Sequence, residues 1–215
     1  MKITVAALGL LALSGIAAAD VVSPGFEQGP AVSEIRFSPT DTDGLGWFAS
    51  NTDGERFQAT GAKPAAEGEY YASLLQNGGA YDGAPLGVGD FGFTGFDRIY
   101  AEFDVLPNTQ YTISFMHASD DRFGYVAATS VVEIVDVGNN ATLDQRMFAT
   151  PGFFQWTGES FSFTTGATTT TAAVAFTVMG SINASGVFDA VSITPAPGSL
   201  ALLGLGGLAM ARRRR

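Results

Sequence analysis

Residues 98–115 read RIYAEFDVLPNTQYTISF and contain two strand-like segments joined by a turn. Within positions 111–115, aromatic or aliphatic residues alternate with Thr and Ser, which is the period-two pattern of a strand with one buried face. The first segment, 98–106, runs directly into Pro107-Asn108, a dipeptide with turn chemistry. The stretch therefore predicts two consecutive strands and a fold built on β-sheet.

Similar patterns recur on both sides of this stretch. Further strand-like segments are 20–26, 47–50, 69–76, 125–137, 160–164, 174–178 and 187–193. The Gly/Phe alternation of 87–95 fits an irregular strand or a loop, and 62–70 is the only weak helix candidate. Many short strands separated by Gly, Asn and Asp turns, without intervening helices, predict an antiparallel β-sandwich.

The composition argues against several classes of function. The chain has 215 residues, no cysteine, one histidine and a formal net charge of -10. An acidic surface repels nucleic acid and suits neutral glycans or divalent cations. Without cysteine and with a single histidine, the chain offers neither thiol catalysis nor a His-rich zinc site. That histidine, His117, has the strand parity of the buried Phe115, and we expect it to be structural.

The N-terminus has the three parts of a signal peptide. Lys2 is a short positive region, 3–16 is an apolar run, and three alanines follow it. We expect cleavage between Ala19 and Asp20. A genuine transmembrane helix is the alternative, but the run is short and ends in alanines.

The C-terminus, PAPGSLALLGLGGLAMARRRR at 195–215, also has three parts. Pro195, Ala196 and Pro197 form a Pro-rich break, and 199–211 is apolar. The chain then ends with a basic cluster, Arg212, Arg213, Arg214 and Arg215. Clustered arginines stay on the cytoplasmic side of a membrane. The alternative is an apolar helix packed on the domain with a solvated basic end.

This tail resembles the PEP-CTERM sorting signal of exported bacterial proteins, with Pro195-Ala196-Pro197 in place of the usual Pro-Glu-Pro. The resemblance implies an exosortase-type membrane protease that cleaves near Pro197, after transient insertion of the tail in the inner membrane. It implies export to the cell surface or the extracellular matrix. The expected organisation is a signal peptide (1–19), one folded domain (20–194) and a sorting tail (195–215), with the tail as an apolar helix.

The folded domain also resembles a known family. The segments that carry the resemblance are SPGFE at 23–27, Trp47 after a loop, 69–79, NTQYTISF at 108–115 and FDAVSI at 188–193. In this order they resemble the galactose-binding-like jelly rolls of family 4/9 type carbohydrate-binding modules. The resemblance implies a single all-β jelly-roll β-sandwich.

The same resemblance implies a structural Ca²⁺ site whose ligands, carried over by position, would be Glu27 and Asp189. Ca²⁺ takes six to eight oxygen ligands, so two carboxylates plus backbone carbonyls are chemically suitable. Asp189 shares strand parity with Val187, Val191 and Ile193, so its carboxylate is expected to be partly buried and in need of a partner. The alternative is that Asp189 caps a turn and Glu27 is solvated.

Flat aromatic side chains are the groups that stack on sugar rings. The candidates are Trp47, Tyr70, Tyr71, Tyr81, Tyr100, Tyr125 and Trp156. Core packing is the alternative for each of them, and Tyr81 is the one expected at the surface.

The sequence thus leads to an exported, non-catalytic surface or matrix protein associated with extracellular polysaccharide. The alternatives are a specific glycan-binding module and a carbohydrate-active hydrolase. A hydrolase would require two close carboxylates in a cleft, other than Glu27 and Asp189.

Overall fold

The computed structural model of the chain describes residues 25–37, 44–49, 54–75, 98–120, 128–180 and 184–196. These residues form eleven β-strands, and none of them is helical. The strands are β1 (Glu34–Arg36), β2 (Phe48–Ala49), β3 (Glu55–Gln58), β4 (Tyr70–Leu75), β5 (Arg98–Asp104), β6 (Gln110–Ser119), β7 (Ala128–Asp136), β8 (Ala141–Ala149), β9 (Thr157–Thr164), β10 (Thr171–Gly180) and β11 (Ser185–Pro195). No helix in this described part is long and apolar enough to span a membrane.

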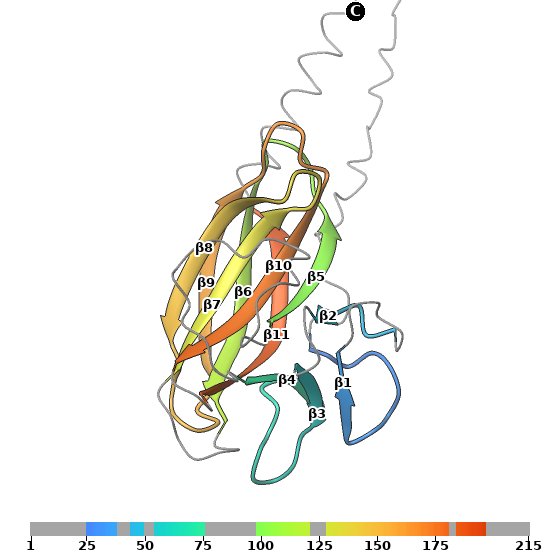
Figure 1. Ribbon diagram of the computed structural model, residues 1–215, viewed down its shortest axis with the longest axis vertical. Helices are drawn as coiled ribbons and strands as arrows, with labels where there is room; N and C mark the ends of the chain where they lie inside the picture. The colour runs from blue at the N-terminus through green and yellow to red at the C-terminus, as the bar shows by residue number, and fades with distance from the viewer. Residues whose placement is uncertain are drawn as a thin grey trace, which may run out of the picture.

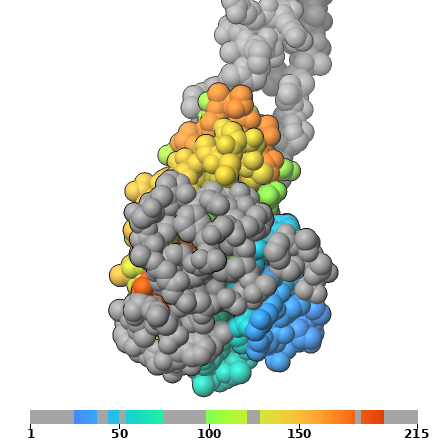
Figure 2. All heavy atoms as spheres, in the orientation of Figure 1, coloured from blue at the N-terminus to red at the C-terminus, as the bar shows by residue number. Residues whose placement is uncertain are grey.

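The strands form two antiparallel sheets packed face to face, which confirms the predicted all-β jelly-roll sandwich (Figure 1). One sheet has the order β1-β3-β4-β11-β6-β9, and the other has the order β2-β5-β10-β7-β8. The consecutive strands β5 and β6 therefore belong to different sheets. The turns 137–140 and 165–170 lie at one end of the sandwich, and the β3–β4 loop, residues 59–69, lies at the other (Figure 2).

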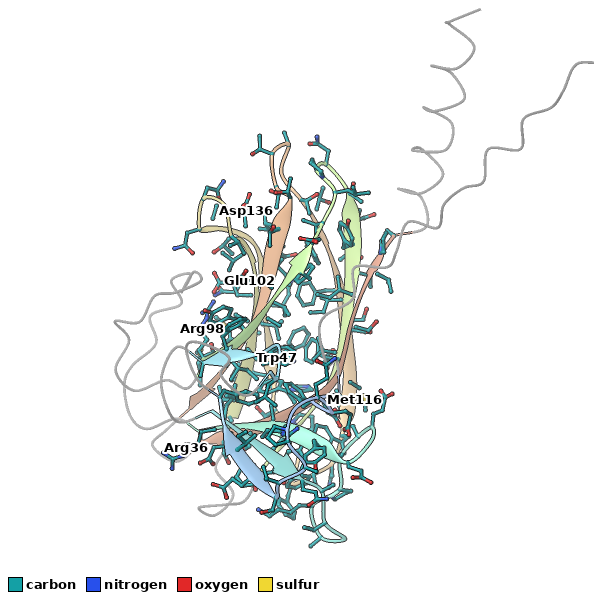
Figure 3. All side chains as sticks on the ribbon, turned by 90° about the vertical axis from the view of Figure 1, so that its right-hand side faces the viewer. Arg36, Trp47, Arg98, Glu102, Met116 and Asp136 are labelled. Carbon is teal, nitrogen blue, oxygen red and sulfur yellow. The ribbon has the colours of Figure 1, made fainter. Side chains whose placement is uncertain are left out.

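The core lies between the sheets and is dominated by aromatic side chains. Trp47 is 0% exposed, with its ring centroid 4.8 Å from that of Phe26 and 5.9 Å from that of Phe176. Phe176 in turn lies 4.7 Å from Phe188 of the opposite sheet. Figure 3 shows Trp47 between the layers, with Arg98 and Met116 on opposite outer sides of the sandwich. Trp47 is therefore a core residue and cannot stack on a sugar.

Most predicted strands are present, and the differences have local causes. Gly25 and Phe26 lie in a turn rather than in the predicted strand 20–26, and 62–70 is mostly loop. β1, β3 and β8 were missed. The first two are short, and β8 shows no alternation because it is an edge strand with both faces partly exposed. β11 extends to Pro195, beyond the predicted end at 193, since its pairing with β6 continues to Tyr111.

The end of β11 is the last described part of the chain. Pro195 pairs with Tyr111, and the N–H of Ala196 donates to the carbonyl of Gln110 at 2.8 Å. The remainder of the predicted sorting motif, from Pro197 to the arginine cluster, lies outside the described residues, as do Ala19 and Asp20.

Strand β11 contains an irregularity that corrects the predicted parity of Asp189. Its register with β6 shifts between Asp189 and Ser192, and Ala190 has a φ of 51°. The alternation of inward-facing and outward-facing side chains along β11 therefore changes phase at the shift. Val187 shares the outer face with Asp189, as expected, but Val191 and Ile193 point into the core.

Candidate functional site

The β3–β4 loop is fixed to the outer face of the six-stranded sheet by side chains that are distant from it in the sequence. Trp156 donates its indole N–H to the carbonyl of Pro64 at 2.9 Å. Lys63 forms a 2.8 Å ion pair with Asp120, whose side chain is almost fully buried. Two carboxylates, of Glu27 and Asp189, accept the loop's backbone N–H groups. This loop joins the predicted metal site to a group of aromatic residues.

The structure brings Glu27 and Asp189 together. An ideal Cβ added to Gly25 would lie 3.6 Å from Oδ1 of Asp189 and 3.8 Å from Oε1 of Glu27. Oε1 of Glu27 accepts the N–H groups of Glu69 and Tyr70, both at 2.9 Å. The two predicted ligands therefore face the same point beside the backbone of Gly25.

Asp189 is 0% exposed, and its carboxylate is surrounded by backbone donors. Oδ2 accepts the N–H groups of Ala66 and Glu67 at 2.7 and 2.9 Å, and Oδ1 accepts that of Ala190 at 2.7 Å. Burial, with a smaller contribution from the nearby charge of Glu27, raises the pKa of Asp189 to about 7, against the lowering effect of these hydrogen bonds. The charged form of such a buried carboxylate is stabilised by any cation that binds beside it.

The residues at this position fit part of a Ca²⁺ shell. Two carboxylates supply hard oxygen ligands, and the burial that raises the pKa of Asp189 removes its carboxylate from water. Within the described residues, no cluster of three or more His, Asp or Glu side chains could hold a metal ion. Any ion here would need backbone carbonyls and water for the rest of its shell.

Arg56 holds the chain on either side of Glu27. Its guanidinium donates to the carbonyls of Phe26 at 3.2 Å and of Gln28 and Pro30 at 2.5 Å. The same group lies 4.1 Å from the centroid of the Tyr70 ring, within the range of a cation–π contact. Arg56 is almost fully buried, so it connects the segment 26–30 to the six-stranded sheet.

An aromatic patch lies beside the loop on the same outer face. We define it as Phe57, Tyr71, Phe153, Phe154 and Trp156. Tyr71 is its buried centre, with the ring of Phe154 at 5.3 Å and that of Trp156 at 6.2 Å. Phe153 is 37% exposed and lies 5.0 Å from Phe154.

The charged Lys63–Asp120 pair borders this patch. Nζ of Lys63 lies 5.8 Å from the Phe154 ring and 6.0 Å from the Phe153 ring. Partly exposed aromatic faces next to a polar pair form an arrangement that can take a sugar ring, because the ring needs both a flat apolar surface and hydrogen-bonding groups.

The outer face of the five-stranded sheet has aromatic residues, but those that the structure describes expose little of their surface. Phe48 stacks on Tyr100 with centroids 5.2 Å apart, and Arg98 forms a buried 2.9 Å ion pair with Glu133. Tyr100, Arg98 and Glu133 are all buried. Burial raises the pKa of Tyr100, with Glu102 adding to the effect. Accessible aromatic surface therefore favours the six-stranded sheet as the candidate site.

Of the predicted aromatic candidates, Trp156 is a partly exposed member of the patch and Tyr71 is its buried centre. Trp47, Tyr70 and Tyr100 are buried elsewhere. Tyr81 and Tyr125 lie outside the described residues. Phe57, Phe153 and Phe154 were not among the predicted candidates. The run Phe153-Phe154 before Trp156 was a usable signal, because consecutive aromatic residues in a loop cannot all face the core.

His117 is structural, as predicted. It is 0% exposed, its Nδ1 lies 3.0 Å from Oγ of Ser130, and Phe115 and Phe148 pack against its ring. Asp120, three residues further along the chain, forms an ion pair with Lys63. Glu159 is the acid beside His117, with Oε1 3.8 Å from Nε2. Burial lowers the pKa of His117 to about 4.

We expect His117 to make the fold sensitive to acid. Because the unfolded chain binds a proton near pH 6.5 and the folded chain only near pH 4, the free energy of unfolding falls as the pH drops below 6.5. Between pH 7 and pH 5 the loss from this group is about 2 kcal/mol. Urea unfolding at both pH values, for the native chain and for His117→Gln, measures it. An equal pH dependence in the two proteins would contradict the assignment.

The chain matches no protein-family model, and no curated protein matches it in sequence. Its fold does match solved structures. TmCBM61, solved in complex with β-1,4-galactotriose, gives a TM-score of 0.53 at 17% identity, over 80% of this chain and 95% of that one. A family 4 carbohydrate-binding module gives 0.53 at 12% identity, over 82% and 99% of the two chains. The CBM22-1 xylan-binding domain from Paenibacillus barcinonensis Xyn10C gives 0.50 at 14% identity, over 85% and 97%.

These neighbours are carbohydrate-binding modules, and the chain shares their jelly-roll fold. At such low identities the likeness establishes the fold alone. The side chains on the two outer faces are therefore the basis for proposing a function.

Proposed function

We propose that the chain is an exported, non-catalytic bacterial surface or matrix protein that binds neutral extracellular polysaccharide through the aromatic patch. The observation that carries the binding role is the exposure of Phe153 and its neighbours on one sheet face, beside the Lys63–Asp120 pair. The net charge of -10 favours a neutral glycan over an acidic one, because like charges repel.

The sorting role rests on the two ends of the sequence. A signal peptide ending at Ala19 and a tail with Pro195, Ala196, Pro197 and four terminal arginines support export and recognition by an exosortase-type protease at the inner membrane. The positions of the tail and of the aromatic patch in the fold are compatible with this role. Ala196 lies beside Gln110 at the start of β6, whereas the patch lies near Ser119 at its end.

Strand β6 has ten residues and so extends about 33 Å. A tail held at the membrane would therefore leave the patch directed away from it, toward the extracellular polysaccharide.

We also propose that Glu27 and Asp189 hold a structural Ca²⁺ ion. When bound, the ion would neutralise the buried charge of Asp189 and stabilise the β3–β4 loop, which carries Lys63 and Pro64 next to the patch. Its role would be to position the loop, with no part in catalysis.

Substitution of Trp156 tests the binding role. Affinity electrophoresis of the full chain through β-1,4-galactan and xylan is expected to show retardation by at least one of them. Trp156→Ala is expected to weaken binding about tenfold or more, since truncating a central aromatic contact costs at least ~1.4 kcal/mol. Phe48→Ala, on the outer face of the other sheet, is the matched control and should bind normally. Equal losses in both variants, or no retardation by any neutral polysaccharide, would contradict the proposal.

A further inference from the structure

The four edge strands of the sandwich differ in how they are protected against pairing with another strand. Exposed edges are normally blocked by shortness, charged side chains, proline or bulges. β1 has three residues, with Glu34 and Arg36 at its ends, and β2 has two. β8 carries Asp144 and Arg146, and its register with β7 is interrupted next to Asp144. Each of these three edges has at least one protective device.

Strand β9 lacks all of these devices except for a single charged residue. It has eight residues, Thr157–Thr164, and its register with β6 is continuous from end to end. It contains no proline, lysine or arginine, and its single charged residue is Glu159. Among the described strands it pairs with β6 alone. Its positions Gly158, Ser160, Ser162 and Thr164 are exposed.

Among the described residues, the outward-facing positions of β9, of the paired part of β6 and of β11 after Ala190 carry no charge. In register across β11, β6 and β9 lie two rows of hydroxyl side chains, Ser192–Ser114–Ser160 and Thr194–Thr112–Ser162. Thr112 and Ser162 are hydrogen-bonded at 3.0 Å. Protein surfaces typically carry roughly a quarter to a third charged residues, so a face without any is unusual in a chain with a net charge of -10.

We propose that β9 is a self-association edge, which pairs antiparallel with β9 of a second copy of this chain. Two copies with a net charge of -10 repel each other over most of their surfaces, and repulsion is weakest where charges are absent. A twofold axis allows the same edge to serve both copies without any other partner.

The pairing can also keep Glu159, the one charged residue of this strand, away from the same residue of the second copy. Directly opposed residues in antiparallel strands share a face. In a pairing centred on Phe161, Ser160 therefore faces the second copy's Ser162, and Glu159 faces the second copy's Phe163. The six-stranded sheet would then continue across the dimer, with an aromatic patch at each end.

Light scattering of the full chain over a concentration series tests the proposal. The native chain is expected to show a concentration-dependent rise to twice the monomer mass. The double variant Ser160→Lys/Ser162→Lys places lysines opposite each other and is expected to stay monomeric. Ser192→Lys/Thr194→Lys, on the same face but two strands from the edge, is the matched control and is expected to dimerise. All three proteins keep the apolar C-terminal segment. Association through that segment would therefore give the same mass in all three.

Thiol cross-linking provides a second measurement that does not depend on the lysine variants folding. The sequence has no cysteine, so Ser160→Cys/Ser162→Cys introduces the only thiols and is expected to give a cross-linked dimer on oxidation. Ser192→Cys/Thr194→Cys is expected to remain uncrosslinked. A native chain that is monomeric at every concentration, or a lysine variant at β9 that still dimerises, would overturn the proposal. Equal cross-linking at both sites would also overturn it. The inference is independent of glycan binding.

Discussion

Replacing Arg56 with leucine is expected to lower the free energy of unfolding by about 3 kcal/mol. The substitution removes a buried guanidinium that bonds three backbone carbonyls, and hydrogen bonds to charged groups contribute about 1.5–3 kcal/mol each before solvent compensates part of the loss. Because Gln28 and Pro30 are exposed, water can replace two of the three bonds. Chemical denaturation of the native chain and the variant measures the difference.

Arg36→Leu is the matched control for this prediction. Its side chain is 63% exposed and pairs with Glu55 at 3.2 Å across the sheet edge. Surface ion pairs contribute about 0–1 kcal/mol, so the control is expected to lose less than about 1 kcal/mol. Similar losses in the two variants would show that Arg56 does not hold the segment 26–30.

The second large loss in the free energy of unfolding is expected when Asp189 is replaced. Asp189→Ala leaves three backbone N–H groups, of Ala66, Glu67 and Ala190, without their acceptor. A buried donor without a partner costs ~1–3 kcal/mol, so a loss of about 3 kcal/mol is expected for the group together. Thermal unfolding is the measurement. Glu67→Gln, which removes a charge from the same loop but keeps the backbone N–H, is expected to unfold like the native chain.

The same measurement with Ca²⁺ and with a chelator tests the proposed ion. Ca²⁺ at about a hundred times its Kd stabilises a folded protein by about 2.7 kcal/mol, which for this size raises Tm by roughly 5–10 °C. The rise is expected in the native chain and in Glu67→Gln and absent in Asp189→Ala. A Tm independent of Ca²⁺ in the native chain would remove the metal site and leave Glu27 and Asp189 as anchors of the β3–β4 loop.

Strand β6 could be predicted because burial alternates along most of its length. In β6, Tyr111, Ile113 and Phe115 all point into the core, as their period-two spacing indicates. The burial of Asp189 was predictable from its strand parity with Val187, and its position beside Glu27 from the family resemblance.

Other features could not be read from the sequence because they depend on contacts between distant segments. The shift after Asp189 depends on a positive φ at Ala190, and alanine has no special preference for that conformation. The aromatic patch forms because residues 153–156 reach across to Tyr71 of β4, a contact that neither segment encodes locally. Nothing in the sequence around Arg56 indicates the three carbonyl groups that its guanidinium bonds in the fold.

The central claim is that the outer face of the six-stranded sheet binds neutral glycan. Its most direct test is the ¹⁵N amide spectrum of the full chain during titration with β-1,4-galactotriose and with xylan fragments. We predict shifts confined to Lys63, residues 153–156 and the neighbouring β4 around Tyr71, together with the indole N–H of Trp156. Shifts centred on Tyr100 and β10 instead would contradict the claim and place binding on the opposite sheet.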